Sequence, residues 1–163
     1  MKSDYRVRAE KFIRSIFKVI EDTLHTPDTI SDLIYEYNWT HNRKIKVSYG
    51  CSRIALITSD YVVKWVYDEE NADEVGGCVD EYYFYQYAKE CGFAYLFAEM
   101  TLFDYRGVTF GIMPRIPNVG IYHHAGCINE YLSRAECNWL IHNVEDLHHG
   151  NWGIKNGHVM IDL

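Results

Sequence analysis

The sequence lacks the features that mark several classes of protein. No apolar run reaches the ~18 residues that a membrane span needs, and the N-terminal segment has no continuous apolar stretch of the signal-peptide type. Only 3 of the 163 residues are proline, and there is no internal repeat or low-complexity tract. Disordered, collagen-like and coiled-coil proteins are therefore excluded, and we expect a soluble, unprocessed chain that forms a single domain.

Cysteine is also used sparingly. The five cysteines are odd in number and contain no Cys-x-x-Cys spacing, which argues against a disulfide framework and against a structural zinc site. A reducing cytoplasm is the compartment that fits. Cys51 lies beside a glycine, where we favour a small turn residue over a reactive thiol. The histidines are better explained as loop and core residues than as metal ligands: His123, His124, His142, His148 and His149.

Basic residues are in the minority, since 16 Lys and Arg stand against 23 Asp and Glu, for a net charge of −7. This balance argues against binding to nucleic acid or to an anionic membrane. The first twenty residues depart from it with six basic side chains: Lys2, Arg6, Arg8, Lys11, Arg14 and Lys18. We interpret them as the solvated face of a helix, with a docking surface as the alternative.

The hydrophobic pattern predicts helices before and after a sheet. Apolar residues recur at helical spacing over residues 5–24, and a second short helix is expected over 29–37, with Asp28 or Thr29 as its N-cap and a loop over 38–43. Further helices are expected over 79–91 and 128–144. Strand patterns cover residues 45–49, 53–57, 61–67, 96–103 and 108–113, and a last hairpin covers 152–161.

Lys64 interrupts an apolar strand. It is flanked by Val63 and Trp65, and an unpaired buried ammonium is costly. The sequence leaves two interpretations open. Lys64 has an anionic partner, or it lies on an edge strand and points to water.

The most specific motif is Asp146-Leu147-His148-His149-Gly150-Asn151. It resembles the Asp-x-x-x-x-Asn catalytic loop of the protein-kinase-like family, in the form found in its aminoglycoside-phosphotransferase-like branch. The segment from Val159 to Leu163 is similar to the strand that ends in that family's metal-binding aspartate, here Asp162. Val144 stands where the family usually has a histidine, and the turn around Gly50 keeps one glycine of the usual three.

The resemblance implies a nucleotide site. Lys64 on the third strand would contact the phosphates of ATP and pair with Glu81 of the following helix, and Asp146 would be catalytic. Asn151 and Asp162 would hold Mg²⁺. The remaining nucleotide contacts expected are Gly50, Ser52, Arg53 and Met113, with Ser52 and Arg53 as phosphate donors and residues 113–117 as an interlobe hinge.

The resemblance also implies the fold class: an α+β, protein-kinase-like chain whose five-stranded antiparallel sheet carries a helix. We expect residues 1–43 to form a helical extension, 44–113 a nucleotide lobe and 114–163 a reduced catalytic lobe without activation segment or substrate-binding helices. The expected function is transfer of the ATP γ-phosphoryl group to a protein serine or threonine. The alternative is a kinase-like protein of a phage or bacterium that binds and regulates a host protein. In either case a homodimer or complex would cover the missing lobe.

Overall fold

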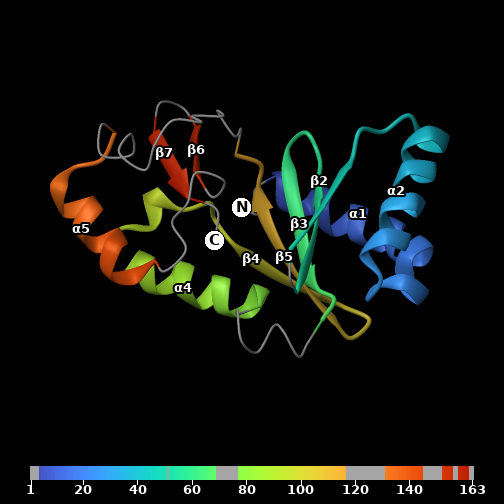
Figure 1. Cartoon of the computed structure of the whole chain (residues 1–163), viewed down its shortest axis with the longest axis horizontal. Helices are drawn as coiled ribbons and strands as arrows, with labels where there is room; N and C mark the ends of the chain where they lie inside the picture. The colour runs from blue at the N-terminus through green and yellow to red at the C-terminus, as the bar shows by residue number, and fades with distance from the viewer. Residues whose placement is uncertain are drawn as a thin grey trace. The chain divides into compact units, whose positions relative to one another are not determined.

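The computed structural model describes residues 4–50, 52–68, 77–116, 131–144, 152–155 and 158–161 (Figure 1). The protein is α+β, and its chain divides into two compact units. One unit contains Met1–Phe84 with Met100–Arg115, and the other contains Tyr85–Glu99 with Ile116–Leu163. The first unit holds a five-stranded sheet, and the second holds a two-stranded one.

The five-stranded sheet of the first unit is antiparallel throughout, as the sequence predicts. Its strands lie in the order β1-β2-β3-β5-β4, so β3 is the central strand. Their bounds are β1 Lys46–Tyr49, β2 Arg53–Ile57, β3 Tyr61–Val66, β4 Thr101–Tyr105 and β5 Val108–Pro114. The turn from β4 to β5 has positive φ at both Arg106 (51°) and Gly107 (81°). This is the backbone of a type I′ hairpin, whose twist matches that of the strands it joins.

The expected strand over residues 96–103 is wrong in its first half. A short 3-10 helix, η2 (Ala94–Leu96), precedes β4, and the strand begins only at Thr101. Phe97 instead forms an isolated parallel bridge with Ile161, and the Ala98 N–H donates to the Ile161 carbonyl at 3.2 Å. Pairing with a segment distant in the sequence therefore overrides the local apolar pattern.

Two helices precede the sheet, α1 (Asp4–Ile20) and α2 (Pro27–His41), with the 3-10 turn η1 (Glu21–Thr23) between them. The expected cap of the second helix is wrong, because the N-cap position is Thr26 and Pro27 occupies the first turn, where a fixed φ and a missing N–H are tolerated. Residues 38–41 are helical, although a loop was expected there. The helix ends at His41, and the left-handed backbone of the next residue, Asn42 (φ 49°), lets the Arg43 N–H donate to the Asn38 carbonyl at 3.0 Å.

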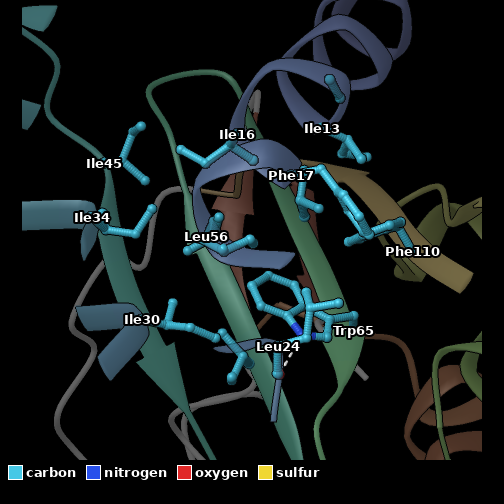
Figure 2. Packing of buried hydrophobic residues seen from close by; sticks show 14 of the residues in the cluster. Ile13, Ile16, Phe17, Leu24, Ile30, Ile34, Ile45, Leu56, Trp65 and Phe110 are labelled. Carbon is cyan, nitrogen blue, oxygen red and sulfur yellow. Dashed lines mark hydrogen bonds between the residues drawn. The ribbon is translucent and has the colours of Figure 1, made fainter. Parts of the chain in front are cut away.

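The core of the first unit lies between α1, α2 and one face of the sheet. Figure 2 shows side chains of both helices pointing at Leu56, Trp65 and Phe110 of the strands, and a hydrogen bond from Trp65 Nε1 to the Leu24 carbonyl at 3.0 Å. α1 contacts β3 and β5, and α2 contacts β1. The helices of residues 4–41 and the sheet thus share one hydrophobic cluster, which contains Ala9, Ile13, Ile16, Phe17, Ile20, Leu24, Ile30, Ile34, Ile45, Ile54, Leu56, Tyr61, Val63, Trp65, Phe110 and Ile112.

In the second unit, helix α5 (Arg134–Asn143) begins later than the expected residue 128. Ser133 starts it with a capping box, in which Glu136 N–H donates to the serine oxygen and Ser133 N–H donates to the Glu136 carboxylate. Trp139 of α5 stacks on Phe93 with ring centroids 4.7 Å apart. β6 (Trp152–Lys155) and β7 (His158–Ile161) form the expected antiparallel hairpin. Within the described part of the chain, no helix is long and apolar enough to cross a membrane.

Candidate functional site

Lys64 lies in the central strand of the five-stranded sheet and is only 8% exposed. Its neighbours Val63 and Trp65 belong to the core beneath the helices, so the alternation of a strand turns Lys64 to the opposite face. The interpretation of Lys64 as an edge-strand residue that points to water is therefore wrong. A buried ammonium at this position needs an anionic partner.

Helix α4 (Cys78–Glu90) supplies that partner, because of the way it begins. The side chain of Asp80 turns back, and its Oδ2 accepts from the Gly77 N–H at 2.8 Å. The first helical hydrogen bond runs from the Glu81 N–H to the Gly77 carbonyl at 3.1 Å. Glu81 therefore stands one turn inside the helix, on the side that meets the sheet, and is only 8% exposed.

Gly111 allows α4 to approach the sheet this closely. It lies directly opposite Lys64 in the pairing of β3 with β5. A Cβ at residue 111 would lie 2.2 Å from Met100 Cε and 3.3 Å from both Cβ and Sγ of Cys78. Gly111 and Cys78 were missed by sequence reasoning. The available signal was a glycine inside a strand pattern, which often marks a close approach of another segment.

The centre of the site is an ion pair between strand and helix. Lys64 Nζ lies 3.5 Å from Glu81 Oε1, and the Arg53 guanidinium donates to the same oxygen. Residues that lie opposite each other on paired strands share a face of the sheet, as do alternate residues of one strand. Arg53 lies opposite Val66, and Ala55 lies opposite Lys64, so Arg53 and Lys64 are on the same face. Glu81 thus gathers cations from β2 and β3. Removal of the carboxylate would leave two cations without this partner in a poorly solvated place.

The turn between β1 and β2 is closed by hydrogen bonds to the backbone of Gly50. The Gly50 N–H donates to the Arg53 carbonyl at 3.0 Å, and the Gly50 carbonyl accepts from the Tyr67 hydroxyl at 2.9 Å. A Cβ at residue 50 would meet nothing within 4 Å. Ser52 is buried, and its carbonyl accepts from the Tyr67 N–H at 2.9 Å. Of the expected phosphate donors, Arg53 contacts Glu81 and is the more accessible.

Met113, the expected hinge residue, lies within β5 and is buried. It pairs with Val62, and β5 continues to Pro114 opposite Tyr61. The first unit ends at Arg115, whose N–H donates to the Asp60 carbonyl at 2.9 Å. The segment expected as a hinge therefore begins with a paired strand.

The thiol of Cys78 is buried beside this ion pair. Burial, and to a lesser extent the carboxylate of Glu81, raise the pKa of this thiol to about 11, while hydrogen bonding to Gly111 and the charges of Lys64 and Arg53 oppose the shift. Since a thiol must lose its proton to act as a nucleophile or metal ligand, Cys78 is chemically inert near neutral pH. Its role here is to pack against Gly111.

The remaining expected site residues, Asp146, Asn151 and Asp162, lie outside the described residues, as does Cys51. Their described neighbours in the sequence are informative: Trp152, which follows Asn151, pairs directly with Ile161, which precedes Asp162. In the described part of the chain, no group of three or more His, Cys, Asp and Glu side chains could hold a metal ion. His142 lies there too, and its Nδ1 is 2.6 Å from the Asn138 carbonyl. The other candidate histidines lie outside it.

Comparison of the chain with models of known protein families, with curated proteins and with solved structures found no match. The chemistry of the site must therefore be argued from its own groups. An ammonium and a guanidinium are donors that suit phosphate oxygens. The described residues thus supply two cationic side chains of the kind that bind a phosphate group.

Proposed function

We infer that this protein is a minimal kinase-like phosphotransferase, which moves the γ-phosphoryl group of ATP to a serine or threonine hydroxyl of a protein. The observation that carries the proposal is the buried contact between Lys64 and Glu81, which ties the central strand β3 to the first turn of α4. In the protein-kinase-like family, a lysine and a glutamate at these places orient the nucleotide phosphates. The antiparallel five-stranded sheet around them supports the same proposal.

The proposed reaction assigns one role to each group. Lys64, held by Glu81, donates to phosphate oxygens and fixes the position of the γ-phosphoryl group. The acceptor hydroxyl oxygen bonds to the γ-phosphorus, the bond to the ADP oxygen breaks, and Asp146 takes the hydroxyl proton. Asn151 and Asp162 would hold a magnesium ion, which offsets the negative charge of the phosphates. The pairing of Trp152 with Ile161 supports this shared role, because these residues adjoin the two ligands in sequence.

A second candidate function is a kinase-like protein that binds and regulates another protein. The contact between Arg53 and Glu81 favours it, because the guanidinium assigned to phosphate already has a carboxylate partner. The burial of Ser52 points the same way, since a buried side chain is a poor phosphate donor. In this alternative, Arg53, Lys64 and Glu81 hold the fold together and no phosphoryl group is transferred.

Calorimetric titration with ATP, with and without magnesium, separates the two functions. We expect binding that requires magnesium and weakens at least about tenfold in Lys64→Met, which keeps the length of the side chain. Lys89→Met is the matched control, since Lys89 is an exposed lysine of the same helix as Glu81. Absence of binding by folded wild-type protein would contradict the proposal and favour the regulatory protein.

Asp146→Asn then tests catalysis separately from binding. We expect it to abolish phosphoryl transfer to protein substrates while leaving the ATP affinity unchanged, because the amide cannot accept the hydroxyl proton. The measurement is transfer of labelled phosphate under single-turnover conditions. Unchanged turnover in Asp146→Asn would rule out the catalytic role of this loop.

A further inference from the structure

The outer face of α2 carries a stripe of two acidic and two aromatic residues. Asp28, Asp32, Tyr35 and Trp39 follow the spacing i, i+4, i+7, i+11, which places them along one side of a helix. All four are exposed, Tyr35 by 76% and Trp39 by 85%. Two large aromatic rings one turn apart are the side chains that interfaces favour, and here they face solvent. We call these four residues the acidic stripe.

The outer face of α1 carries a stripe of the opposite charge with the same spacing. Val7, Lys11, Arg14 and Lys18 again follow i, i+4, i+7, i+11, and all four are exposed. We call them the basic stripe. The residues of α1 that enter the core lie on the other side of the helix, so the basic stripe is directed away from the sheet.

Most charged side chains of the two stripes have no ionic or hydrogen-bonding partner among the described residues. The side chains of Lys11, Lys18 and Asp32 make no ion pair or hydrogen bond in the part of the chain that the structure describes. Asp28 Oδ1 accepts a long hydrogen bond of 3.3 Å from the Tyr49 hydroxyl. Arg14 lies over the rings of Phe103 and Tyr105, with centroid distances of 5.0 and 5.1 Å, and remains exposed.

We propose that the acidic stripe of one molecule docks on the basic stripe of a second copy of this chain, with α2 of one antiparallel to α1 of the other. Each stripe spans about 16 Å, since eleven residues separate its ends at about 1.5 Å per residue. The antiparallel alignment is the one that places both aspartates of the acidic stripe opposite basic side chains. It brings together Asp28 with Lys18, Asp32 with Arg14, Tyr35 with Lys11, and Trp39 with Val7.

Each of these four contacts is chemically favourable. Two are ion pairs, the ammonium of Lys11 over the ring of Tyr35 is a cation–π contact, and Trp39 covers the apolar Val7. A parallel alignment would place Asp28 beside Val7 and Lys18 beside Trp39, and would form one ion pair, Asp32 with Lys11, in place of two. Every copy carries both stripes, so the contact is made twice in a closed dimer or once per copy in a head-to-tail chain. Both outcomes support the proposal, and neither depends on the proposed nucleotide site.

Charge reversal on the full-length protein tests the pairing directly. The first variant is Lys11→Glu/Lys18→Glu, and the second is Asp28→Lys/Asp32→Lys. Sedimentation velocity from about 1 to 100 μM protein, at about 50 mM salt where charges are weakly screened, reports association. We expect the wild type to associate, each variant alone to associate at least about tenfold more weakly, and the 1:1 mixture of the two variants to associate again.

Controls separate this pairing from a general effect of charge or misfolding. Lys44→Glu/Lys89→Glu makes the same change of charge as the first variant at exposed lysines outside the stripe, and should associate like the wild type. Trp39→Ala/Tyr35→Ala leaves the charge unchanged and should weaken association. A monomeric wild type, a variant that associates like the wild type, or a mixture that stays monomeric while both variants keep the wild-type circular dichroism spectrum would overturn the proposal.

Discussion

The two faces of the five-stranded sheet differ in what they contribute to the protein. One face is apolar and lies under α1 and α2, with Val63 and Trp65 of β3 fully buried there. The other face presents Lys64 of the same strand, which meets Glu81 of α4. Because successive side chains of a strand point to opposite faces, neighbouring residues of β3 contribute to the apolar core on one side and to the charged site on the other.

Burial has opposite consequences for stability on the two faces of the sheet. On the apolar face it removes hydrocarbon from water, which stabilises the fold by about 25 cal/mol for each Å². On the other face it removes charges from water, which opposes folding unless the groups are paired. A buried ion pair is therefore a weak source of stability.

The largest expected effect is on the apolar face. Trp65→Ala should lower the free energy of unfolding by about 3–5 kcal/mol, because it leaves a cavity and removes the hydrogen bond to the Leu24 carbonyl. Chemical denaturation followed by circular dichroism measures this. Trp39→Ala is the matched control and should change stability by less than about 0.5 kcal/mol, since Trp39 is 85% exposed. Equal effects of the two substitutions would contradict the conclusion that burial on the apolar face stabilises the fold.

A smaller loss is expected on the charged face. Glu81→Gln should lower the free energy of unfolding by about 3 kcal/mol, because Lys64 and Arg53 lose their common carboxylate. The double variant Lys64→Met/Glu81→Leu should recover at least half of that loss, since apolar side chains of similar size suit a buried place. Under the proposed function, the double variant should nevertheless fail to bind ATP. A double variant less stable than Glu81→Gln would show that the ion pair itself stabilises this face.

The smallest effect concerns the pH dependence that Cys78 gives to the same face. Its pKa is about 11 in the folded protein, above the value of about 8.5 for a free thiol. Between these two values the unfolded chain binds fewer protons than the folded protein. The contribution of Cys78 to stability is therefore complete below about pH 8.5 and is lost as the pH rises to about 11. Between pH 8.5 and 10.5, wild type should lose about 2 kcal/mol more stability than Cys78→Ala. Parallel pH profiles would mean that the thiol is not held protonated.

Much of the fold followed from local patterns. The strands β1, β2, β3 and β5 were expected nearly at their observed bounds, because alternation, apolar side chains and turn residues agree there. Element ends were less predictable. The 3-10 helix before β4 depends on the pairing of Phe97 and Ala98 with Ile161, which lies more than sixty residues away.

The candidate site was predictable only in part. Lys64 and Glu81 were expected as a pair from the resemblance of the element order to the protein-kinase-like family, and the structure brings them to 3.5 Å. The contact between Arg53 and Glu81 was not expected, because it depends on the register that places Arg53 and Lys64 on the same face. The packing of Cys78 against Gly111 was missed for a similar reason, since a glycine inside a strand pattern indicates a close approach but does not identify the segment that approaches.

The sequence by itself determined the local elements, because helix and strand periodicity, the proline at the start of α2 and the hairpin glycine act within a few residues. It also determined that Lys64 would need a partner or water, since burial of an unpaired charge is costly. Tertiary structure decided that Lys64 has an anionic partner and is not exposed to water. β3 became a central strand through its pairing with β5, and Gly111 left room for α4 to bring Glu81 to Lys64. Such contacts join segments far apart in the sequence, and no local pattern records them.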